Sequence, residues 1–343
     1  MGAATMATFR AVQVNTPGKM EVVDRPLFDP PAGRVRLRVE ACGICHTDSF
    51  TVDGLIPDIA FPRVPGHEVV GIIDAIGEGV SGWKIGQRVG VGFLAGHCGA
   101  CSPCRRGDFV NCSKQPISGV HHDGGYAESM IAIPSGLAAI PDELGSAEAA
   151  PLLCAGLTTY NALRHSSAYP GDLVAVQGIG GLGHLGVQFA ARMGFRVAAI
   201  ARGTEKEPLA RQLGAHHYID TTAGDPATAL EALGGAKVIV ATASDSKSMS
   251  DLIGGLAPRG RMIVAGTGSS PIEVPPAHLL FGSRGIEGTL TGSAIDNEDT
   301  LAFSVLQKIR PMIETVPLEK AADGYQRMLS NKARFRMVIV MDK

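Results

Sequence analysis

The sequence has little of what marks an exported, membrane-bound or nucleic-acid-binding protein. Its 31 basic and 33 acidic residues form no long run of either sign, so a basic surface for nucleic acid is not expected. Residues 1–8 lack the basic start and apolar core of a secretory signal, and Met6 stands where a myristoylation signal needs Ser or Thr. The longest uncharged run, residues 173–191, contains five glycines and is better explained as a strand, a glycine turn and a helix than as a membrane span.

Cysteine is scarce as well. Seven cysteines in 343 residues are too few for a disulfide scaffold, and six of them fall into spacings that suit metals, which favours a reducing cytoplasm. Hydrophobic residues make up 45% of the chain and charged residues only 19%, so a large core can form, and the length suggests about two domains. We therefore expect a soluble cytoplasmic protein with small, uncharged partners, and neither nucleic acid nor membrane among them.

The apolar pattern changes along the chain. Up to about residue 141, short β-type runs such as 35–39 and 69–73, broken by Gly and Pro, predict an irregular β-rich domain. From residue 173, strands and helices alternate, which predicts βαβ units in a doubly wound parallel sheet and hence an α/β fold. The alternating elements expected are strands 173–177, 197–201, 217–220, 237–241 and 261–265, helices 183–193, 207–213 and 247–256, and a helix opened by Asp225 and Pro226. After about residue 288 the alternation relaxes into two amphipathic helices, 298–309 and 319–330, and a last strand, 335–341.

Four cysteines lie within fifteen residues in the spacing Cys-x2-Cys-x2-Cys-x7-Cys: Cys98, Cys101, Cys104 and Cys112. Flanking glycines let four thiolates converge tetrahedrally on one ion, which predicts zinc, with free or redox-active thiols as the weaker alternative. An iron–sulfur cluster uses similar spacing but normally has Pro after the last Cys, where this chain has Ser113. Because four thiolates leave no open position for a substrate, this zinc should be structural.

A glycine motif alone is weak in a chain with 44 glycines, but its context here is informative. The run Gly178-Ile179-Gly180-Gly181-Leu182-Gly183 follows an apolar strand and opens a helix, the arrangement in which a dinucleotide pyrophosphate binds helix N-terminal amides. At the end of the next strand, Ala201 stands where NAD-binding proteins carry an acidic residue for the ribose hydroxyls. With Arg202 and Lys206 nearby, the charge favours NADP over NAD, although basic residues on a helix surface would look the same.

Three scattered residues also have metal-binding chemistry: Cys45, His67 and Cys154. Taken singly, such a cysteine is more often an inert buried residue, and such a histidine is more often hydrogen-bonded. Together with the cysteine and glycine motifs, however, the runs Gly43-Ile44-Cys45-His46-Thr47-Asp48 and Gly66-His67-Glu68 resemble those of the zinc-containing medium-chain alcohol dehydrogenases, over nearly the whole chain. The bacterial and yeast-like enzymes and the cinnamyl-alcohol-dehydrogenase-like group are most similar, because the run between residues 77 and 98 is short.

The resemblance implies a second, catalytic zinc held by Cys45, His67 and Cys154, with a fourth position open to the substrate oxygen. Acting as a Lewis acid, this zinc would lower the pKa of a bound alcohol or polarise an aldehyde. Asp48 would orient His67, and Glu68 would lie beside the metal or bind it transiently. A turn residue and a surface carboxylate remain the alternative interpretations of Asp48 and Glu68.

The resemblance also assigns residues to proton transfer, cofactor and substrate. Thr47 matches the hydroxyl that starts proton transfer, but many relatives carry a histidine three residues later, where this chain has Phe50. Protons would then leave through Thr47, the cofactor ribose and water. The remaining matched positions are His46 as a proton-relay helper or pyrophosphate contact, Thr158 beside the nicotinamide, Arg336 on the pyrophosphate, and Phe50, Leu55 and Phe93 around an apolar pocket for primary aliphatic or aromatic alcohols and aldehydes.

The implied organisation is a GroES-like catalytic domain over residues 1–151 and again over 291–343, with a Rossmann domain over 152–290 between them. Substrate would enter the cleft between the domains, and the family suggests a homo-oligomer, a tetramer or a dimer. Two rival functions are reduction of an activated C=C bond or another carbonyl on the same fold, and a non-catalytic zinc and nucleotide-binding protein. Retention of Thr47 and of the three open-site ligands argues against both.

Overall fold

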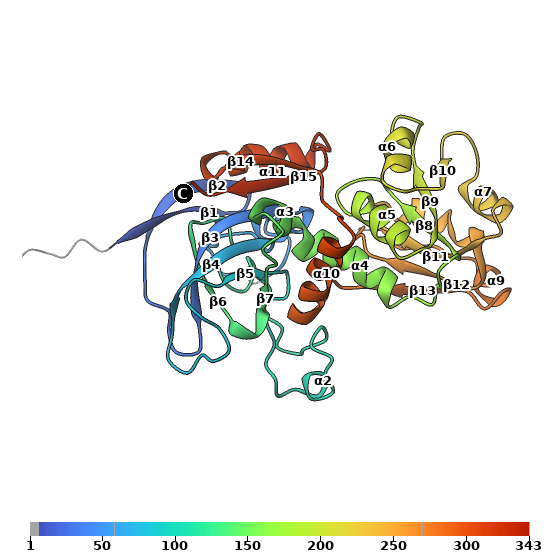
Figure 1. Ribbon diagram of the computed structural model, residues 1–343. Helices are drawn as coiled ribbons and strands as arrows, with labels where there is room; N and C mark the ends of the chain where they lie inside the picture. Colours follow the sequence, from blue (N-terminus) through green and yellow to red (C-terminus); the bar gives the residue numbers. More distant parts are fainter. Residues whose placement is uncertain (1–6, 58, 269, 343) are drawn as a thin grey trace, which may run out of the picture. The chain divides into compact units, whose positions relative to one another are not determined.

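The computed structural model describes residues 7–57, 59–268 and 270–342, so most of the N-terminal segment considered above, including Met6, lies outside the described residues. The chain divides into two compact units, one formed by Met1–Cys154 with Gly292–Lys343 and the other by Ala155–Thr291. The fold is α/β: the first unit is β-rich, and the second holds a parallel sheet with helices packed on it (Figure 1).

The first unit is built mainly on antiparallel strands. They are β1 (Thr8–Thr16), β2 (Lys19–Pro26), β3 (Val35–Ile44), β4 (Val69–Ile76), β5 (Arg88–Val91), β6 (Ser129–Ala132), β7 (Leu137–Ala139), β14 (Ile313–Pro317) and β15 (Arg336–Val340). β1 and β2 form a hairpin, and the main sheet has the order β14-β15-β3-β4-β5-β7, with β6 also paired to β3. Cys42 on β3 lies opposite Val69 on β4, and Ile44 lies opposite Met337 on β15. The end of β3 therefore meets the beginnings of β4 and β15.

Helices in this unit are mostly short. They are η1 (His46–Asp48), α1 (Ser49–Val52), α2 (Ser102–Arg105), η2 (Pro134–Gly136), α3 (Ser146–Pro151), the first part of the π-helix η3 (Leu152–Gly156), α10 (Ala294–Leu306), η5 (Leu318–Lys320) and α11 (Ala321–Leu329). The sequence predicted a helix from residue 298, but α10 begins four residues earlier. The carboxylate of Asp296 accepts hydrogen bonds from the backbone N–H and the hydroxyl of Ser293, which caps the helix at that point.

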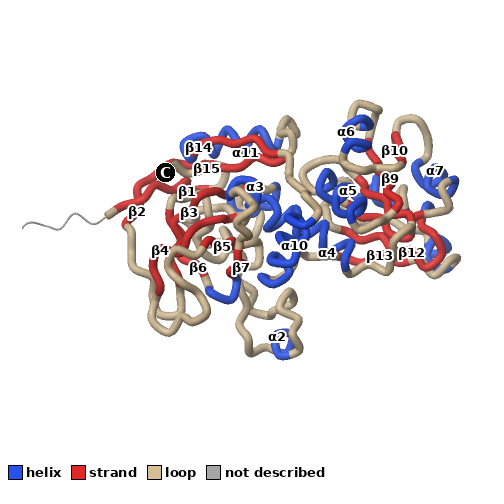
Figure 2. The backbone as a smooth tube through the Cα atoms, viewed as in Figure 1, coloured by secondary structure: helices blue, strands red, loops and turns tan. Residues whose placement is uncertain are grey.

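The second unit contains a six-stranded parallel sheet in the order β10-β9-β8-β11-β12-β13. Its strands are β8 (Leu173–Gln177), β9 (Arg196–Ala201), β10 (His217–Asp220), β11 (Ala236–Ala241), β12 (Leu256–Val264) and β13 (Gly285–Gly288), and its helices include α4 (Leu157–Arg164), α5 (Gly183–Arg192), α6 (Glu207–Gln212), α7 (Pro226–Ala232), α8 (Ser246–Ser250) and α9 (Pro276–Leu280). Numbered along the chain, this is the strand order 3-2-1-4-5-6 of the dinucleotide-binding fold. The predicted doubly wound parallel sheet is confirmed, and Figure 2 shows the strands and helices in the same view.

One predicted helix of this unit is wrong. The sequence predicted a helix over residues 247–256, but α8 ends at Ser250 and a single 3-10 turn, η4 (Ile253–Gly255), follows it. Gly255 packs so closely on Leu230 that an added Cβ would lie 2.8 Å from the Leu230 Cβ. Leu256 pairs with Ala236 as the first residue of β12. Gly254 and Gly255 weaken the helix, and Leu256, which the helical pattern included, belongs to a strand instead.

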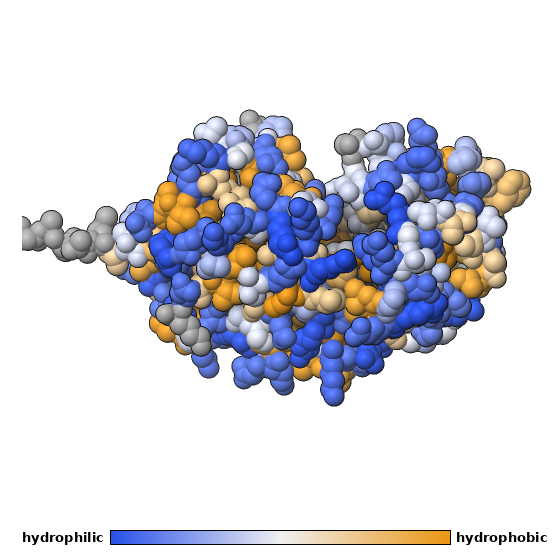
Figure 3. Space-filling model, turned by 90° about the horizontal axis from the view of Figure 1, so that it is seen from above, coloured by the Kyte–Doolittle hydropathy of each residue, from blue (hydrophilic) through white to orange (hydrophobic). Residues whose placement is uncertain are grey.

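The surface of the protein is largely polar in the view of Figure 3, where hydrophobic residues form small scattered patches. Among the described residues, helices of the length and apolarity that a membrane crossing requires do not occur.

Candidate active site

Strand register brings the first group of candidate ligands together. Cys45 directly follows β3, and His67 and Glu68 directly precede β4, so the antiparallel pairing of these strands places the three residues side by side. The backbone N–H of Gly43 donates to the carbonyl of Glu68 over 3.0 Å, which fixes this junction. Cys154 joins them from η3. The ligand atoms of Cys45, His67, Glu68 and Cys154 all lie within 4.8 Å of one another, as a metal site requires.

Cys154 lies in an irregular helical turn. Pro151 ends α3, and the chain continues as the π-helix Leu152–Gly156 before α4 begins at Leu157. Proline lacks the N–H that an α-helix interior needs, and single π turns within helices are frequently found at functional sites. The turn gives Cys154 a half-buried position, whereas Cys45, His67 and Glu68 are buried.

His67 has one satisfied and one unsatisfied ring nitrogen. Its Nδ1 lies 2.8 Å from Oδ1 of Asp48, and its ring packs edge-on against Phe93 with centroids 5.3 Å apart. Its Nε2 is buried and has no hydrogen-bond partner among the described residues. A buried imidazole nitrogen next to two thiols is the donor set expected for zinc, so these residues fit that ion. Burial lowers the pKa of His67, but the charges of Asp48 and Cys45 outweigh burial and raise it.

Asp48 is held on three sides. Besides the contact with His67, its Oδ2 accepts hydrogen bonds from the backbone N–H of Cys45 over 2.9 Å and from the hydroxyl of Tyr126 over 2.7 Å. Asp48 and Tyr126 are 3% and 0% exposed. Burial, with the nearby charge of Asp48, raises the pKa of Tyr126, so the phenol stays protonated and donates. Tyr126 belongs to no recognisable sequence motif, because a lone tyrosine 78 residues from its partner forms no spacing pattern.

Glu68 forms a buried ion pair with Arg336, the first residue of β15. The two side chains are 0% and 5% exposed. Burial raises the pKa of Glu68 to about 7 against the opposing charge of Arg336, while Glu68 offsets the burial of Arg336 and raises its pKa. The resemblance placed Arg336 on the pyrophosphate, whereas the structure pairs it with Glu68. Its buried Nε has no hydrogen-bond partner among the described residues and so remains a donor for another acceptor.

The two site thiols lie close together and affect each other's ionisation. Interaction with Cys154 lowers the pKa of Cys45, and interaction with Cys45, together with burial, raises the pKa of Cys154. Thr47, in the 3-10 turn η1, has its hydroxyl 3.6 Å from the sulfur of Cys45 and is half-buried. The remaining candidates around this group differ in exposure: Phe93 is 7% exposed, Phe50 is half-buried in α1, His46 is exposed and Leu55 is 62% exposed.

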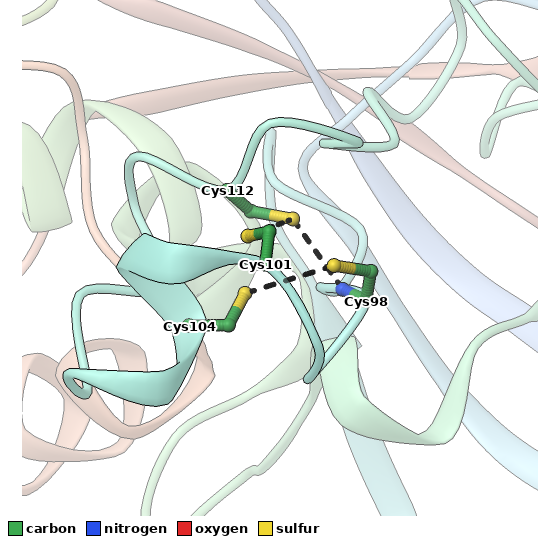
Figure 4. A group of neighbouring side chains, drawn as sticks. All are labelled: Cys98, Cys101, Cys104 and Cys112. Carbon is green, nitrogen blue, oxygen red and sulfur yellow. Dashed lines mark hydrogen bonds between the residues drawn. The ribbon is translucent and has the colours of Figure 1, made fainter.

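The second group of ligands is the four-cysteine cluster. The sulfurs of Cys98, Cys101, Cys104 and Cys112 lie within 4.8 Å of one another and point toward a common centre (Figure 4). Cys98 and Cys104 form one sulfur pair and Cys101 and Cys112 another, each 4.0 Å apart. The segment is mostly loop, with the single short helix α2, as Figure 2 shows. Four thiols at this spacing without a disulfide among the described cysteines fit a tetrahedral ion.

The glycine-rich run forms a tight turn between β8 and α5. Gly178 has φ +84° and its N–H donates to Ile200, which ties the turn to β9. An added Cβ on Gly183 would lie 1.7 Å from the carbonyl oxygen of Gly178, so only glycine fits there. Gly180, by contrast, faces open space, with no described heavy atom within 4 Å of an added Cβ. This backbone geometry allows a phosphate to approach closely.

The end of β9 lies beside this turn. Ala201 is paired with Asp220 of β10, and Asp220 accepts a hydrogen bond from the N–H of Gly203 over 2.7 Å. Lys206 donates to the carbonyl of Ile179 over 3.0 Å, so its charge lies against the glycine turn, and Arg202 is exposed. Asp220 was not anticipated as a neighbour, because its position depends on the pairing of β9 with β10. Of the other cofactor candidates, Thr158 is 7% exposed in α4, and Gly181 and Leu182 lie in the turn itself.

Comparison with known proteins agrees with this geometry. Residues 31–142 match the alcohol dehydrogenase GroES-like domain family, and residues 181–307 match the zinc-binding dehydrogenase family. Alcohol dehydrogenase patD of Penicillium expansum is 40% identical over 342 residues, which cover 99% of this chain and 100% of the relative. An alcohol dehydrogenase of Geobacillus stearothermophilus is 36% identical and matches 94% of this chain and 95% of its own length.

Solved structures point the same way. The cinnamyl alcohol dehydrogenase of Sorghum bicolor has a TM-score of 0.88 at 30% identity, covering 97% of this chain and 98% of its own. The enzyme named CAD from Helicobacter pylori, solved with NADP(H), has a TM-score of 0.85 at 27% identity and covers 98% of this chain and 99% of its own. The fold and the two donor sets are those of a zinc-binding oxidoreductase. The chain belongs to the zinc-containing medium-chain alcohol dehydrogenases, and it is a zinc-dependent alcohol dehydrogenase or aldehyde reductase.

Proposed function

We propose that Cys45, His67 and Cys154 hold the catalytic zinc and that Cys98, Cys101, Cys104 and Cys112 hold a second, structural zinc. The observation that carries the first assignment is the unpaired, buried Nε2 of His67 among the site sulfurs. When bound, zinc supplies Lewis acidity that polarises the oxygen of an alcohol or aldehyde and lowers the pKa of the alcohol. The second cluster presents four sulfurs to one centre, which supports a purely structural ion.

The reaction is transfer of a hydride between a primary alcohol and NAD(P), with release of one proton for each alcohol oxidised. Thr47 places its hydroxyl beside Cys45, and we assign it the first proton: it accepts the proton of the alcohol and passes its own toward the cofactor ribose and water. His46 is exposed next to it and can accept the proton from water. Phe93 packs against His67 and supplies apolar surface at the metal ligands, and we assign Phe50 to the same pocket, which supports aliphatic or aromatic alcohols over charged substrates.

For the cofactor, we propose binding at the glycine turn with a preference for NADP. The absence of a carboxylate at Ala201 and the exposed Arg202 beside it support this preference, although Asp220 on the adjacent strand opposes it. Two variants test the assignment. Ala201→Asp should shift the ratio of kcat/KM values toward NADH on the order of a hundredfold, and Arg202→Ala should weaken NADPH alone by about 1 to 3 kcal/mol. A parent that prefers NADH and is unaffected by Arg202→Ala would refute it.

The deciding experiment is a steady-state screen. Ethanol, butanol, benzyl alcohol and the matching aldehydes are tested with both cofactors at the absorbance of reduced nicotinamide, with and without a zinc chelator. Chelator-sensitive turnover of primary alcohols or aldehydes supports the proposal, whereas silence toward every substrate would favour a non-catalytic zinc and nucleotide-binding protein. We also propose a cytoplasmic homo-oligomer, and light scattering on the purified chain tests the dimer or tetramer.

A further inference from the structure

Tyr126 is built into the site by its backbone as well as by its side chain. The loop 118–126 lies along the segment that leads into His67. The N–H of Tyr126 donates to Pro65 over 3.0 Å, and the N–H of Gly125 donates to Gly66 over 3.2 Å. The Tyr126 ring covers Gly66 so closely that an added Cβ there would lie 2.5 Å from the ring. The ring therefore has a fixed position relative to the metal-ligand segment.

The phenol of Tyr126 is one end of a linear chain of contacts. Its hydroxyl donates to Oδ2 of Asp48 over 2.7 Å, and Oδ1 of the same carboxylate lies 2.8 Å from Nδ1 of His67. The opposite ring nitrogen, Nε2, is the one without a partner. A buried carboxylate needs compensating donors, and Asp48 has two for Oδ2: this phenol and the N–H of Cys45. Removal of the phenol leaves one donor on that oxygen and frees the carboxylate to rotate about its Cβ–Cγ bond.

We propose that Tyr126 is a positioning residue for the metal site, which fixes the carboxylate of Asp48 and thereby the tautomer and orientation of His67. This inference rests on the proposed role of His67 as a zinc ligand. With the carboxylate fixed, Nδ1 carries the proton and Nε2 presents its lone pair to the metal. The Tyr126 side chain is fully buried and its hydroxyl donates to Asp48, so Tyr126 acts through Asp48.

The chain offers a closely matched control. Tyr325 is 1% exposed, and its hydroxyl donates to Oδ2 of Asp53 over 2.9 Å within the same unit. Tyr126→Phe and Tyr325→Phe therefore each remove one phenol–aspartate hydrogen bond of a buried tyrosine, but Asp53 is exposed and only the first bond leads to His67. Loss of an outer hydrogen-bond partner of a metal-bound histidine typically costs 10- to 100-fold in metal affinity. Because Tyr126 is one contact farther out, we expect about a tenfold loss.

The test measures metal binding in the folded holoenzyme. Zinc release to a chromogenic chelator is followed for the parent and both variants, and the open site is then loaded with Co²⁺, whose visible thiolate and d–d bands report its geometry. Tyr126→Phe should release one zinc about tenfold more readily, bind Co²⁺ correspondingly more weakly and alter these bands, while the second zinc is unaffected. Tyr325→Phe should behave as the parent in every metal measurement, even where its Tm falls.

A double-mutant cycle separates positioning from simple loss of structure. Adding Tyr126→Phe to Asp48→Asn should cause no further loss of metal affinity, because the phenol acts through the carboxylate. Parent-like metal release and Co²⁺ bands in Tyr126→Phe, additive losses in the double variant, or a Tyr126→Phe chain that does not fold would each overturn the proposal. If Cys45→Ala contains as much zinc as the parent, the assignment of the metal ligands is refuted instead. Failure of the Tyr126 proposal and failure of the ligand assignment are therefore distinguishable.

Discussion

Two glycine-to-alanine substitutions in the glycine turn of the second unit should have separate effects, one on the stability of the fold and the other on cofactor binding. In Gly183→Ala, the new Cβ would lie 1.7 Å from the carbonyl oxygen of Gly178, and Cβ atoms essentially never approach closer than 3.0 Å, so the two must separate by about 1.3 Å. That carbonyl cannot retreat freely, because it accepts a hydrogen bond from Thr242 over 3.1 Å. We expect a loss of about 1 to 3 kcal/mol in the free energy of unfolding, typical of overpacking, and a drop in Tm on the order of 5 °C.

In Gly180→Ala the expected result is the reverse. An added Cβ there meets no described heavy atom within 4 Å, so the fold should tolerate it with an unchanged or slightly raised Tm. The methyl group would, however, stand where a pyrophosphate must approach the backbone, and we expect the Kd for the dinucleotide to rise at least about tenfold, or 1.4 kcal/mol. Gly224→Ala, which also faces open space in the described structure, is the matched control and should change neither quantity.

The assays are thermal unfolding by circular dichroism and cofactor binding by titration calorimetry. If Gly180→Ala binds the dinucleotide as tightly as Gly224→Ala, the turn does not contact the pyrophosphate. If Gly183→Ala is as stable as Gly224→Ala, the close approach to the Gly178 carbonyl carries no cost.

Three further predictions concern the metals, the proton and the pH dependence. Cys45→Ala should abolish turnover yet leave a folded chain with one zinc by metal analysis, whereas Cys101→Ala should mainly lower Tm; one zinc in the parent would contradict this. Thr47→Ala should lower kcat by roughly 100-fold while Thr47→Ser stays near the parent, and normal turnover of the alanine variant at neutral pH would exclude the hydroxyl. Burial and the charge of Arg63 lower the pKa of His122 from 6.5 to about 4 in the folded chain. As the pH falls, His122 is therefore protonated first in the unfolded chain, and the free energy of unfolding decreases between pH 6.5 and 4. At pH 5, the free energy of unfolding measured in urea should be about 2 kcal/mol higher in His122→Gln than in the control His278→Gln, which replaces an exposed histidine. Equal pH profiles of stability for the two variants would refute this prediction.

Parts of the protein whose residues lie close together in the sequence could be predicted from the sequence alone. The four cysteines of the loop and the glycines of the turn lie within fifteen and six residues, so local geometry alone limits what they can hold. The alternation of strands and helices likewise predicted the parallel sheet. Where two signals competed, as at residues 247–256, tertiary pairing decided, since Leu256 belongs to the strand that pairs with Ala236.

Features created by strand register were not accessible in this way. Cys45 and His67 were found only because their motifs resemble those of a family, and nothing in composition or periodicity placed them together. The pairing of Ile44 with Met337 brings Arg336 to Glu68, although the two are 268 residues apart in the sequence. The sequence around either residue does not indicate the other as its partner. Asp220 reaches Ala201 in the same manner.

The buried charges suggest why the site needs these long-range partners. At the proposed metal site, two thiolates would balance a zinc ion, which leaves the carboxylates of Asp48 and Glu68 to be compensated by the protein. Arg336 pairs with Glu68, and Asp48 relies on His67, the phenol of Tyr126 and the N–H of Cys45. Each carboxylate thus draws on residues outside the recognisable metal motifs. Substitution of such a partner should therefore impair metal binding while leaving every ligand in place, which is why motif matching alone underestimates how much of the chain the site depends on.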